Sequence, residues 1–386
     1  MSSVDEFAYD PADEAFPDRA FEIYRTLRDV HPVYHSAARE SWVLSRYEDV
    51  KAAAADTDTF SSEQTSISTG LRPMIQQMDP PRHDAVRNLL WKAMTPRRVA
   101  AMEPRVRELA RGLIGAFLDR GEGDLLHDFA SQLPSLVIGE LIGIPPERRA
   151  AFLGWTEALI TANPAVEWEA NPFEAIYGEF ADLLAMRRRE RQADLMSALI
   201  DAELDGKKLD EDELLGFCFL LVVGGNDTTT NLIANGAVLL ARHPDQRREL
   251  TDDPSLIPGA VEEMLRYDSP TQALPRRATR DVSLHGVQIE KGEEVSLLWG
   301  AANHDDRRFK EPERFDIHRA SNHHLALGHG IHFCMGSHLA RLEGRVAVDE
   351  LLRALPDFTL QTEPVWQPSA WARAYKSVPV EFGSPA

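Results

Sequence analysis

The sequence predicts a mainly α-helical protein with a small β-sheet region, and three observations support this fold class. Apolar residues recur at helical spacing along most of the chain of 386 residues. The longest such pattern, residues 209–244, is apolar nearly all round and therefore predicts a helix that runs through the core. Strand-like composition is limited to short segments, of which residues 281–299 are the clearest.

Composition narrows the class of protein. The 43% of apolar residues can bury a large core, and the net charge of −20 argues against nucleic acid and anionic membranes as partners. The two cysteines, Cys218 and Cys334, lie far apart and indicate no disulfide framework, which fits a reducing compartment. No signal peptide or membrane span is indicated. We therefore expect a cytoplasmic protein whose residues 1–17 form a partly ordered extension.

Predicted helices alternate with breaks in the first half of the chain. Helices are expected at residues 18–30, 47–55 and 173–191, several more between residues 97 and 162, and a hairpin at residues 33–36 and 42–45. Residues 61–78 show no sustained period and predict a long loop; such loops are usually functional or disordered. Residues 161–172 contain two Asn-Pro pairs and predict a second break.

A helix predicted after Pro81 carries His83, Arg87 and Trp91 four residues apart and therefore on one face. From these residues alone, an ordinary solvated face is the simplest interpretation.

The predicted helix over residues 209–244 contains the sequence GGNDTT in its middle. A glycine inside a helix costs about 1 kcal/mol relative to alanine, so Gly224 and Gly225 need a reason, of which close helix packing is the simplest. Phe217, Gly224 and Thr228 share one stripe of the helix. The stripe ends at a hydroxyl beside the carboxylate of Asp227, which indicates a groove with a proton source at its end.

The stretch LALGHGIHFCMG, residues 325–336, places Cys334 in a glycine-rich loop before a predicted helix. A helix N-terminus stabilises a thiolate over a thiol. Three interpretations of Cys334 stay open on these residues: a small buried hydrophobe, a haem thiolate ligand, or a zinc ligand. The zinc site would add His329, His332 and His338, but their spacing fits none of the common structural zinc patterns.

GHGIHFCMG followed by LARLE resembles the haem-binding loop of the cytochrome P-450 superfamily in its soluble bacterial form. GGNDTT resembles the acid–alcohol motif of this family, and Glu263-x-x-Arg266 and PERF follow in the expected order across roughly residues 80 to 355. One departure is Leu327, where the family usually has Phe. The resemblance implies one domain over residues 1–386 with the cytochrome P-450 fold, a triangular prism of about a dozen or more helices with a small β subdomain.

The resemblance also implies the site residues. Cys334 would be the metal ligand of haem b, Asp227 and Thr228 would deliver protons to dioxygen, and Gly328 and Gly224 would give room at the cofactor. The haem propionates would be bound by His83, Arg87, Arg276 and His332, with Arg277 a rival of Arg276. Glu263, Arg266 and Arg314 would form a buried charge network of purely structural importance.

The implied activity is a monooxygenase that inserts one atom of O2 into a C–H or C=C bond. The chain has no flavin or iron–sulfur motif, so a separate ferredoxin and ferredoxin reductase are expected as electron donors. Arg341 and Arg345 are candidates for the ferredoxin contact, although they can equally be plain solvated arginines. The expected substrate is an apolar small molecule of the fatty acid, terpenoid, steroid or macrolide class; candidate pocket residues are Met74, Ile75, Met78, Phe217, Leu221 and Leu274. A monomer is expected. A hydrogen-peroxide-driven peroxygenase and a non-catalytic haem ligand sensor are the alternatives.

Overall fold

The computed structural model describes residues 7–68, 71–91, 94–149, 151–154, 172–192, 194–204, 207–320 and 322–383. These residues divide into two compact units, each built from segments distant in sequence. Unit 1 comprises residues 1–69, 262–334 and 365–376, and unit 2 comprises residues 70–261, 335–364 and 377–386. The single domain expected from the sequence stays a prediction.

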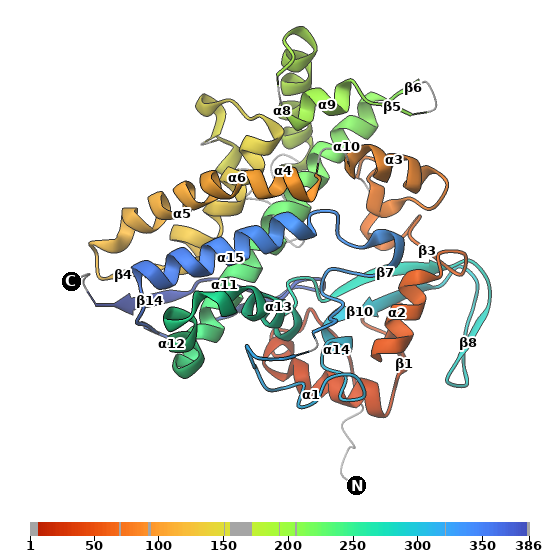
Figure 1. Cartoon of the computed structure of the whole chain (residues 1–386). Coiled ribbons are helices and arrows are strands. Elements are labelled where there is room, and N and C mark those ends of the chain that lie inside the picture. The colour runs from red at the N-terminus through yellow and green to blue at the C-terminus, as the bar shows by residue number, and fades with distance from the viewer. Residues whose placement is uncertain are drawn as a thin grey trace. The chain divides into compact units, whose positions relative to one another are not determined.

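A five-stranded sheet in the order β1-β2-β10-β7-β3 organises unit 1 (Figure 1). Its strands are β1 (Val33–Ser36), β2 (Ser41–Leu44), β10 (Glu294–Leu298), β7 (Ala273–Ala278) and β3 (Phe60–Ser61). β1 and β2 form the hairpin predicted from the sequence, with Val33 opposite Leu44. β10 is parallel to β2 and antiparallel to β7, so segments more than 200 residues apart in the sequence form one sheet.

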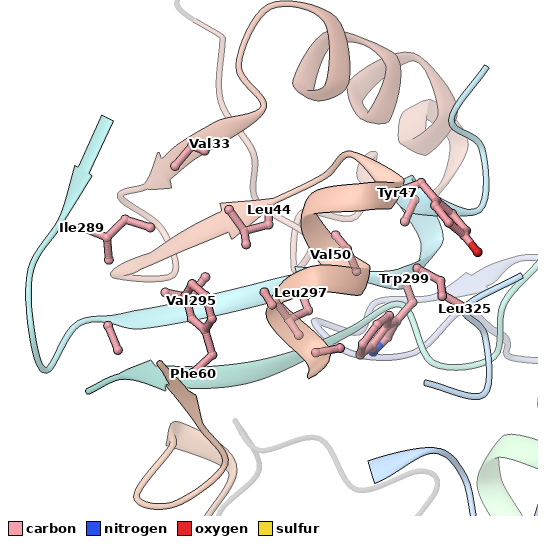
Figure 2. Close-up of a cluster of buried hydrophobic side chains, with 14 of the residues drawn as sticks. Val33, Leu44, Tyr47, Val50, Phe60, Ile289, Val295, Leu297, Trp299 and Leu325 are labelled. Atoms are coloured by element: carbon pink, nitrogen blue, oxygen red, sulfur yellow. The ribbon is translucent and has the colours of Figure 1, made fainter. Parts of the chain in front are cut away.

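Alternating side chains of this sheet face two different apolar clusters, as the two-residue period of a strand requires. Leu44, Val295 and Leu297 belong to a cluster with Val50 of helix α2 (Tyr47–Ala55) and with Trp299 of the short helix α14 (Trp299–Ala302) (Figure 2). Their neighbours in the sequence, Val43 and Leu298, pack in a second cluster with residues of α1 (Phe16–Asp29). One helix therefore covers each face of the sheet.

The rest of unit 1 consists of short elements at the sheet. They are the antiparallel pair β8 (Val282–Leu284) and β9 (Val287–Ile289), and the pair β12 (Trp366–Gln367) and β13 (Ala374–Tyr375). His285-Gly286 and Lys291-Gly292 form turns next to these strands, with Gly286 and Gly292 at φ of +78° and +92°. Helix α13 (Ile257–Tyr267) carries the chain from unit 2 into unit 1.

Helices make up most of unit 2 (Figure 1). They are α3 (Arg82–Trp91), α4 (Pro96–Ala101), α5 (Glu103–Leu118), α6 (Gln132–Ile142), α8 (Pro172–Arg189), α9 (Leu195–Ile200), α10 (Glu211–Val222), α11 (Thr228–Arg242), α12 (Pro244–Asp252) and α15 (Ser337–Ala354). A sheet in the order β11-β14-β4 joins Phe358–Leu360, Pro379–Phe382 and Glu122–Asp124, and β5 (Glu203–Leu204) pairs with β6 (Lys207–Lys208).

The predicted helices are confirmed where the structure describes them. After Ser61, the last residue of β3, the described part of residues 61–78 contains two 3₁₀ turns, Ser66–Ser68 and Ile75–Gln77, and is otherwise irregular, as expected of a loop. The break predicted at residues 161–172 lies outside the described residues except for Pro172, which begins α8. Strand β4 was not predicted because its sequence, Glu-Gly-Asp, has no strand character; its pairing with β14 depends on residues far along the chain.

One carboxyl group is buried on α15, which lies beside α5 in unit 2 (Figure 1). Glu343 is 1% exposed, and within the described residues neither carboxyl oxygen has a hydrogen-bond partner. Burial raises the pKa of Glu343 well above its ordinary value, which favours the neutral form of this side chain.

Candidate active site

The loop that carries Cys334 is held by its own backbone. The amide of Cys334 donates a hydrogen bond to the carbonyl of Leu327 at 2.8 Å, and the amide of Gly328 donates to the carbonyl of Leu325 at 2.9 Å. Gly328 and Gly330 have φ of +73° and +71°, a conformation that residues with a Cβ rarely adopt. The loop therefore requires its first two glycines for conformational reasons. Helix α15 begins at Ser337, directly after Gly336, as the sequence predicts.

The same loop packs closely against helix α2 of unit 1. A Cβ added to Gly330 would lie 2.7 Å from the carbonyl oxygen of Ala54, a backbone atom that cannot turn aside. Leu325 is buried in the cluster that α2 shares with the sheet (Figure 2). The sheet thus fixes α2, and α2 fixes the loop.

A buried charge network supports the segment before this loop. Arg266 donates two hydrogen bonds of 2.8 Å to the carboxylate of Glu263, and both side chains are 0% exposed. The sequence prediction of Arg314 as third member was wrong. Arg319 takes that place, with its Nε 3.1 and 3.0 Å from the two oxygens of Glu263. Arg314 contributes only its carbonyl, which accepts bonds from the two other arginines.

This network is connected to the cysteine loop by hydrogen bonds. Asn322 Nδ2 donates to Glu263 Oε2 at 3.0 Å, and Arg266 donates to the carbonyl of Asn303 at 2.9 Å. The side-chain oxygen of Asn303 accepts a bond from the amide of Leu325 at 2.7 Å. The charge network therefore orients the chain as it enters the loop, in addition to holding the fold together.

Unit 1 also holds two of the predicted cationic residues. Ser62 Oγ and His332 Nε2 lie 3.0 Å apart, and Arg276 on β7 is 4% exposed. Arg277, the rival of Arg276, donates its side-chain hydrogen bonds to the carbonyls of Gln64 and Gly292 at 2.7 and 2.6 Å. Arg276 also bonds to backbone, with its Nη1 2.8 Å from the carbonyl of Pro275, so the two arginines differ in burial: Arg276 is buried, whereas Arg277 is half-buried.

In unit 2, the long predicted helix is confirmed with one change in its middle. Between α10 and α11 the residues Val223–Asp227 form a π-helical turn. Thr228 Oγ1 donates to the carbonyl of Gly224 at 2.7 Å, so the hydroxyl satisfies a carbonyl at the widened turn. Such a bond from a hydroxyl to the carbonyl four residues earlier loosens the helix at this point.

The carboxyl group of Asp227 lies beside that turn. It accepts a hydrogen bond from Asn231 Nδ2 at 3.3 Å, which favours the charged form. Burial has the larger effect and raises the pKa of Asp227 to about 6. A carboxyl group with this pKa exchanges protons readily near neutral pH.

Exposure varies sharply along this helix. Phe217 and Val222 are buried, 1% and 2% exposed, and Thr229 is 2% exposed. Between them, Val223 is 37% exposed, and Gly224 beside it is also exposed. An otherwise buried helix thus leaves backbone and an apolar side chain uncovered at its widened turn. Such a turn has space for a flat, largely apolar group.

Helix α3 of unit 2 carries the remaining predicted residues. His83 is fully buried, and its Nδ1 lies 2.9 Å from Asp84 Oδ1. Arg87 is half-buried one turn further on. Trp91 is 40% exposed and its ring contacts that of His338 with centroids 6.2 Å apart. The helix does not present a plain solvated face, since its histidine is buried.

The segment before α3 is bound to α10. Arg72 forms an ion pair with Asp212, and Arg82 forms one with Glu213. A Cβ on Gly216 would lie 2.0 Å from the carbonyl oxygen of Pro73, so this close approach requires glycine. Arg72 is already paired within the chain. Met74, Ile75 and Met78, predicted as pocket residues, are all buried.

Comparisons with known proteins agree with this geometry. A sequence profile of the family "Cytochrome P450" matches residues 172–370. Cytochrome P450 107B1 of Saccharopolyspora erythraea is 39% identical, with 96% of this chain and 97% of that protein covered. The chain belongs to the cytochrome P450 superfamily.

Other P450s give the same result. Vitamin D(3) 25-hydroxylase of Pseudonocardia autotrophica is 40% identical, with 93% of both chains covered. The solved structure of cytochrome P450 CYP109Q5 from Chondromyces apiculatus superposes with a TM-score of 0.90 at 35% identity, covering 98% of this chain and 100% of the other. The predicted P450 fold is therefore confirmed, and the protein is a P450 monooxygenase with a haem-thiolate iron cofactor.

The residues of this P450 fit that cofactor. Cys334 forms no disulfide and is partly exposed, as an iron ligand must be, whereas Cys218 is fully buried, which raises the pKa of its thiol to about 12. His332 and Arg276, the two predicted carboxylate ligands of unit 1, both carry groups that can donate hydrogen bonds. P450s use redox partners and hydrophobic substrates. Among the described residues, every helix is too short or too polar to cross a bilayer.

Sequence reasoning missed three contributors to this geometry. Ser62, Arg319 and Asn226 contact His332, Glu263 and Ser135, respectively. Each of these pairs joins segments more than 50 residues apart, and the residue types are common on any polar surface. Of the three, only Asn226 could have been singled out from its sequence neighbours, because it lies within the motif GGNDTT.

Proposed function

We propose that this P450 inserts one atom of O2 into a C–H bond of an apolar small molecule and reduces the other atom to water, with two electrons from a ferredoxin and its reductase. The observation that carries this proposal is the widened turn at Gly224, where the hydroxyl of Thr228 and the carboxyl of Asp227 adjoin the uncovered stretch of helix. A monooxygenase needs two protons at the oxygen that leaves as water. A ligand sensor needs none, so this pair of residues favours the enzyme.

Cys334 is proposed as the thiolate ligand of haem b. The cofactor, when bound, supplies the redox chemistry that activates O2. The loop contributes a sulfur held by the amide bond to Leu327 and placed shortly before the N-terminus of α15, which favours its charged form. Gly224, which is exposed, and Gly328, which is half-buried, are proposed to leave room for the cofactor because neither has a side chain. The donors proposed for its two carboxylates are His83, Arg87, Arg276 and His332.

Asp227 and Thr228 are proposed to act in sequence. Asp227, with a pKa of about 6, takes protons from solvent, and the hydroxyl of Thr228 passes them on. The bond from Thr228 to the carbonyl of Gly224 orients this hydroxyl and keeps the turn open. Substrates of the fatty acid, terpenoid, steroid or macrolide class all suit the buried Met74, Ile75 and Met78. The relative named as a vitamin D(3) hydroxylase makes steroid-type molecules the first to test.

Two measurements test this function. The reduced wild-type protein with carbon monoxide should give the red-shifted band of a thiolate ligand, and Cys334→His should lose it. Thr228→Ala should keep the band but divert electrons to hydrogen peroxide. Thr229→Ala removes a buried hydroxyl one residue further on and should leave coupling unchanged. A wild type without the band, or unchanged coupling in Thr228→Ala, contradicts the proposal.

The proposed electron donor is tested separately, with the arginines Arg341 and Arg345 on α15. Arg345 is exposed on this helix and is proposed to contact the acidic ferredoxin, with Arg341 one turn before it. Arg345→Glu should slow turnover with ferredoxin, most strongly at low salt. Product formed by the wild type from hydrogen peroxide alone, at the rate obtained with ferredoxin, would instead indicate a peroxygenase.

A further inference from the structure

The π-helical turn Val223–Asp227 is held from outside by helix α6 of unit 2. Ser135 Oγ on α6 donates a hydrogen bond to Asn226 Oδ1 at 2.6 Å. Ser135 is 1% exposed and Asn226 is 2% exposed, so water does not compete for this bond. The carbonyl of Ser131, one turn back on the chain, is a second acceptor at 2.9 Å.

Helix α6 makes a second contact with the same turn. Ile138 stands three residues after Ser135 and so lies on the same face of α6. Its Cδ1 would be 2.5 Å from a Cβ at Gly225, which means that the helix approaches the turn as closely as glycine allows. One polar and one apolar contact therefore fix two successive residues, Gly225 and Asn226.

These two residues directly precede Asp227 and Thr228. A π turn breaks the regular ladder of helix hydrogen bonds, and it persists where the surrounding structure determines it. The bond from Thr228 to Gly224 acts inside the turn, whereas Ser135 and Ile138 act from a neighbouring helix. Because the amide of Asn226 is bound at a fixed point of α6, the backbone that carries the Asp227 carboxyl has a defined position.

We infer that Ser135 is a positioning residue for proton delivery: through Asn226 it keeps the π turn open and Asp227 and Thr228 in place. This inference rests on the proposed function of Asp227 and Thr228. The bond that Ser135 forms with this turn goes to Asn226, so its loss should loosen the turn without removing a reacting group.

Ser135→Ala tests this role, with Ser135→Thr as the variant that keeps the hydroxyl. Backbone amide exchange of residues 222–228 should become about fivefold faster in Ser135→Ala, the factor expected for one lost net hydrogen bond. In the holoenzyme, a larger share of the electrons should appear as hydrogen peroxide, while the reduced carbon monoxide band stays that of wild type. Ser135→Thr should restore both properties. Ser197→Ala removes another buried hydroxyl of unit 2, one that accepts a bond from Gln192, and should change neither.

Unchanged exchange in Ser135→Ala would overturn the inference, and so would faster exchange with unchanged coupling. Asn226→Ala breaks the same bond from the other side and replaces Ser135→Ala if that variant does not fold. Failure of the proposed function would be recognised by other results. The wild type would lack the thiolate band, or Thr228→Ala would form no additional hydrogen peroxide, and neither result depends on the amide exchange rates of the Ser135 variants.

Discussion

The cysteine loop of unit 1 and the π turn of unit 2 hold their residues by different means. In the loop, two glycines at positive φ and a backbone bond from Cys334 to Leu327 determine the conformation. In the turn, side chains determine it: Thr228 bonds back to Gly224, and Ser135 and Ile138 contact it from α6. A backbone-determined loop tolerates few substitutions at its glycines. A turn determined by side chains has partners that can shift or be replaced one at a time.

The largest effect is expected from Gly330→Ala in the cysteine loop. The substituted residue would have to keep a positive φ, and its Cβ would lie 2.7 Å from the carbonyl oxygen of Ala54. Strain and overpacking together should lower the free energy of unfolding by about 3 to 5 kcal/mol and reduce haem content. Gly286→Ala is the control, because Gly286 has a φ of +78° with no atom near its Cβ position. Urea unfolding should show a loss of only about 1 kcal/mol there. Equal losses in both variants would mean that the contact with Ala54 is unimportant.

Arg319→Met tests whether the charge network supports the loop. Removing one partner of a buried ion pair costs about 3 to 5 kcal/mol, and the loss should be read both in stability and in haem retention. Arg314→Met changes an exposed side chain at the position that the sequence suggested, and should alter stability by about 0.5 kcal/mol or less. A larger loss of stability in Arg314→Met than in Arg319→Met would mean that the side chain of Arg314, and not that of Arg319, belongs to the network.

Asp227→Asn tests whether burial beside the π turn raises the pKa of this carboxyl group, through the pH dependence of protein stability. The raised pKa means that the folded protein binds a proton that the unfolded chain has already released between about pH 4 and pH 6. Wild-type stability therefore falls as pH rises through that window and stays lower above it. Asp227→Asn lacks this cost and should be more stable by about 1 to 3 kcal/mol at pH 8, with a smaller advantage at pH 5, while its turnover is slower.

Urea unfolding at the two pH values measures this difference. Asp182→Asn, on an exposed position of α8, should show the same stability change at both. A pH-independent difference for Asp227→Asn would show that the carboxyl is not destabilised by burial.

The smallest effect is expected from Gly225→Ala in the π turn. Its Cβ would meet two side-chain atoms of Ile138, Cδ1 at 2.5 Å and Cγ1 at 3.0 Å, and no backbone atom of another element within 4 Å. The better helix propensity of alanine, about 1 kcal/mol, offsets part of the overlap, so stability should change by about 1 kcal/mol or less. Adding Ile138→Val shortens the side chain and should relieve the overlap. In this double variant the share of electrons that ends in product, rather than in hydrogen peroxide, should equal that of the wild type. A loss as large as that of Gly330→Ala would contradict the distinction between the two regions.

The same distinction explains what the sequence could predict. The glycine-rich loop GHGIHFCMG and the helix over residues 209–244 depend on residues within a few positions of each other, and both predictions agree with the structure. Ser135 and Asn226 are 91 residues apart, and Arg319 lies 56 residues from Glu263. Nothing in the local pattern distinguishes Arg319 from Arg314, which stands in the familiar PERF. The choice between them is made by how residues 310–322 turn back onto α13.

The raised pKa of Glu343 gives the folded molecule a pH dependence that the formal charge of −20 does not show, because that charge counts all 62 acidic residues as ionised. Burial favours the protonated form of this carboxyl group in the folded chain. Unfolding exposes it to water, so the folded chain binds this proton more tightly than the unfolded chain does. Mildly alkaline buffers therefore favour the unfolded chain at this residue, although the sequence gives it the same formal charge as any surface glutamate.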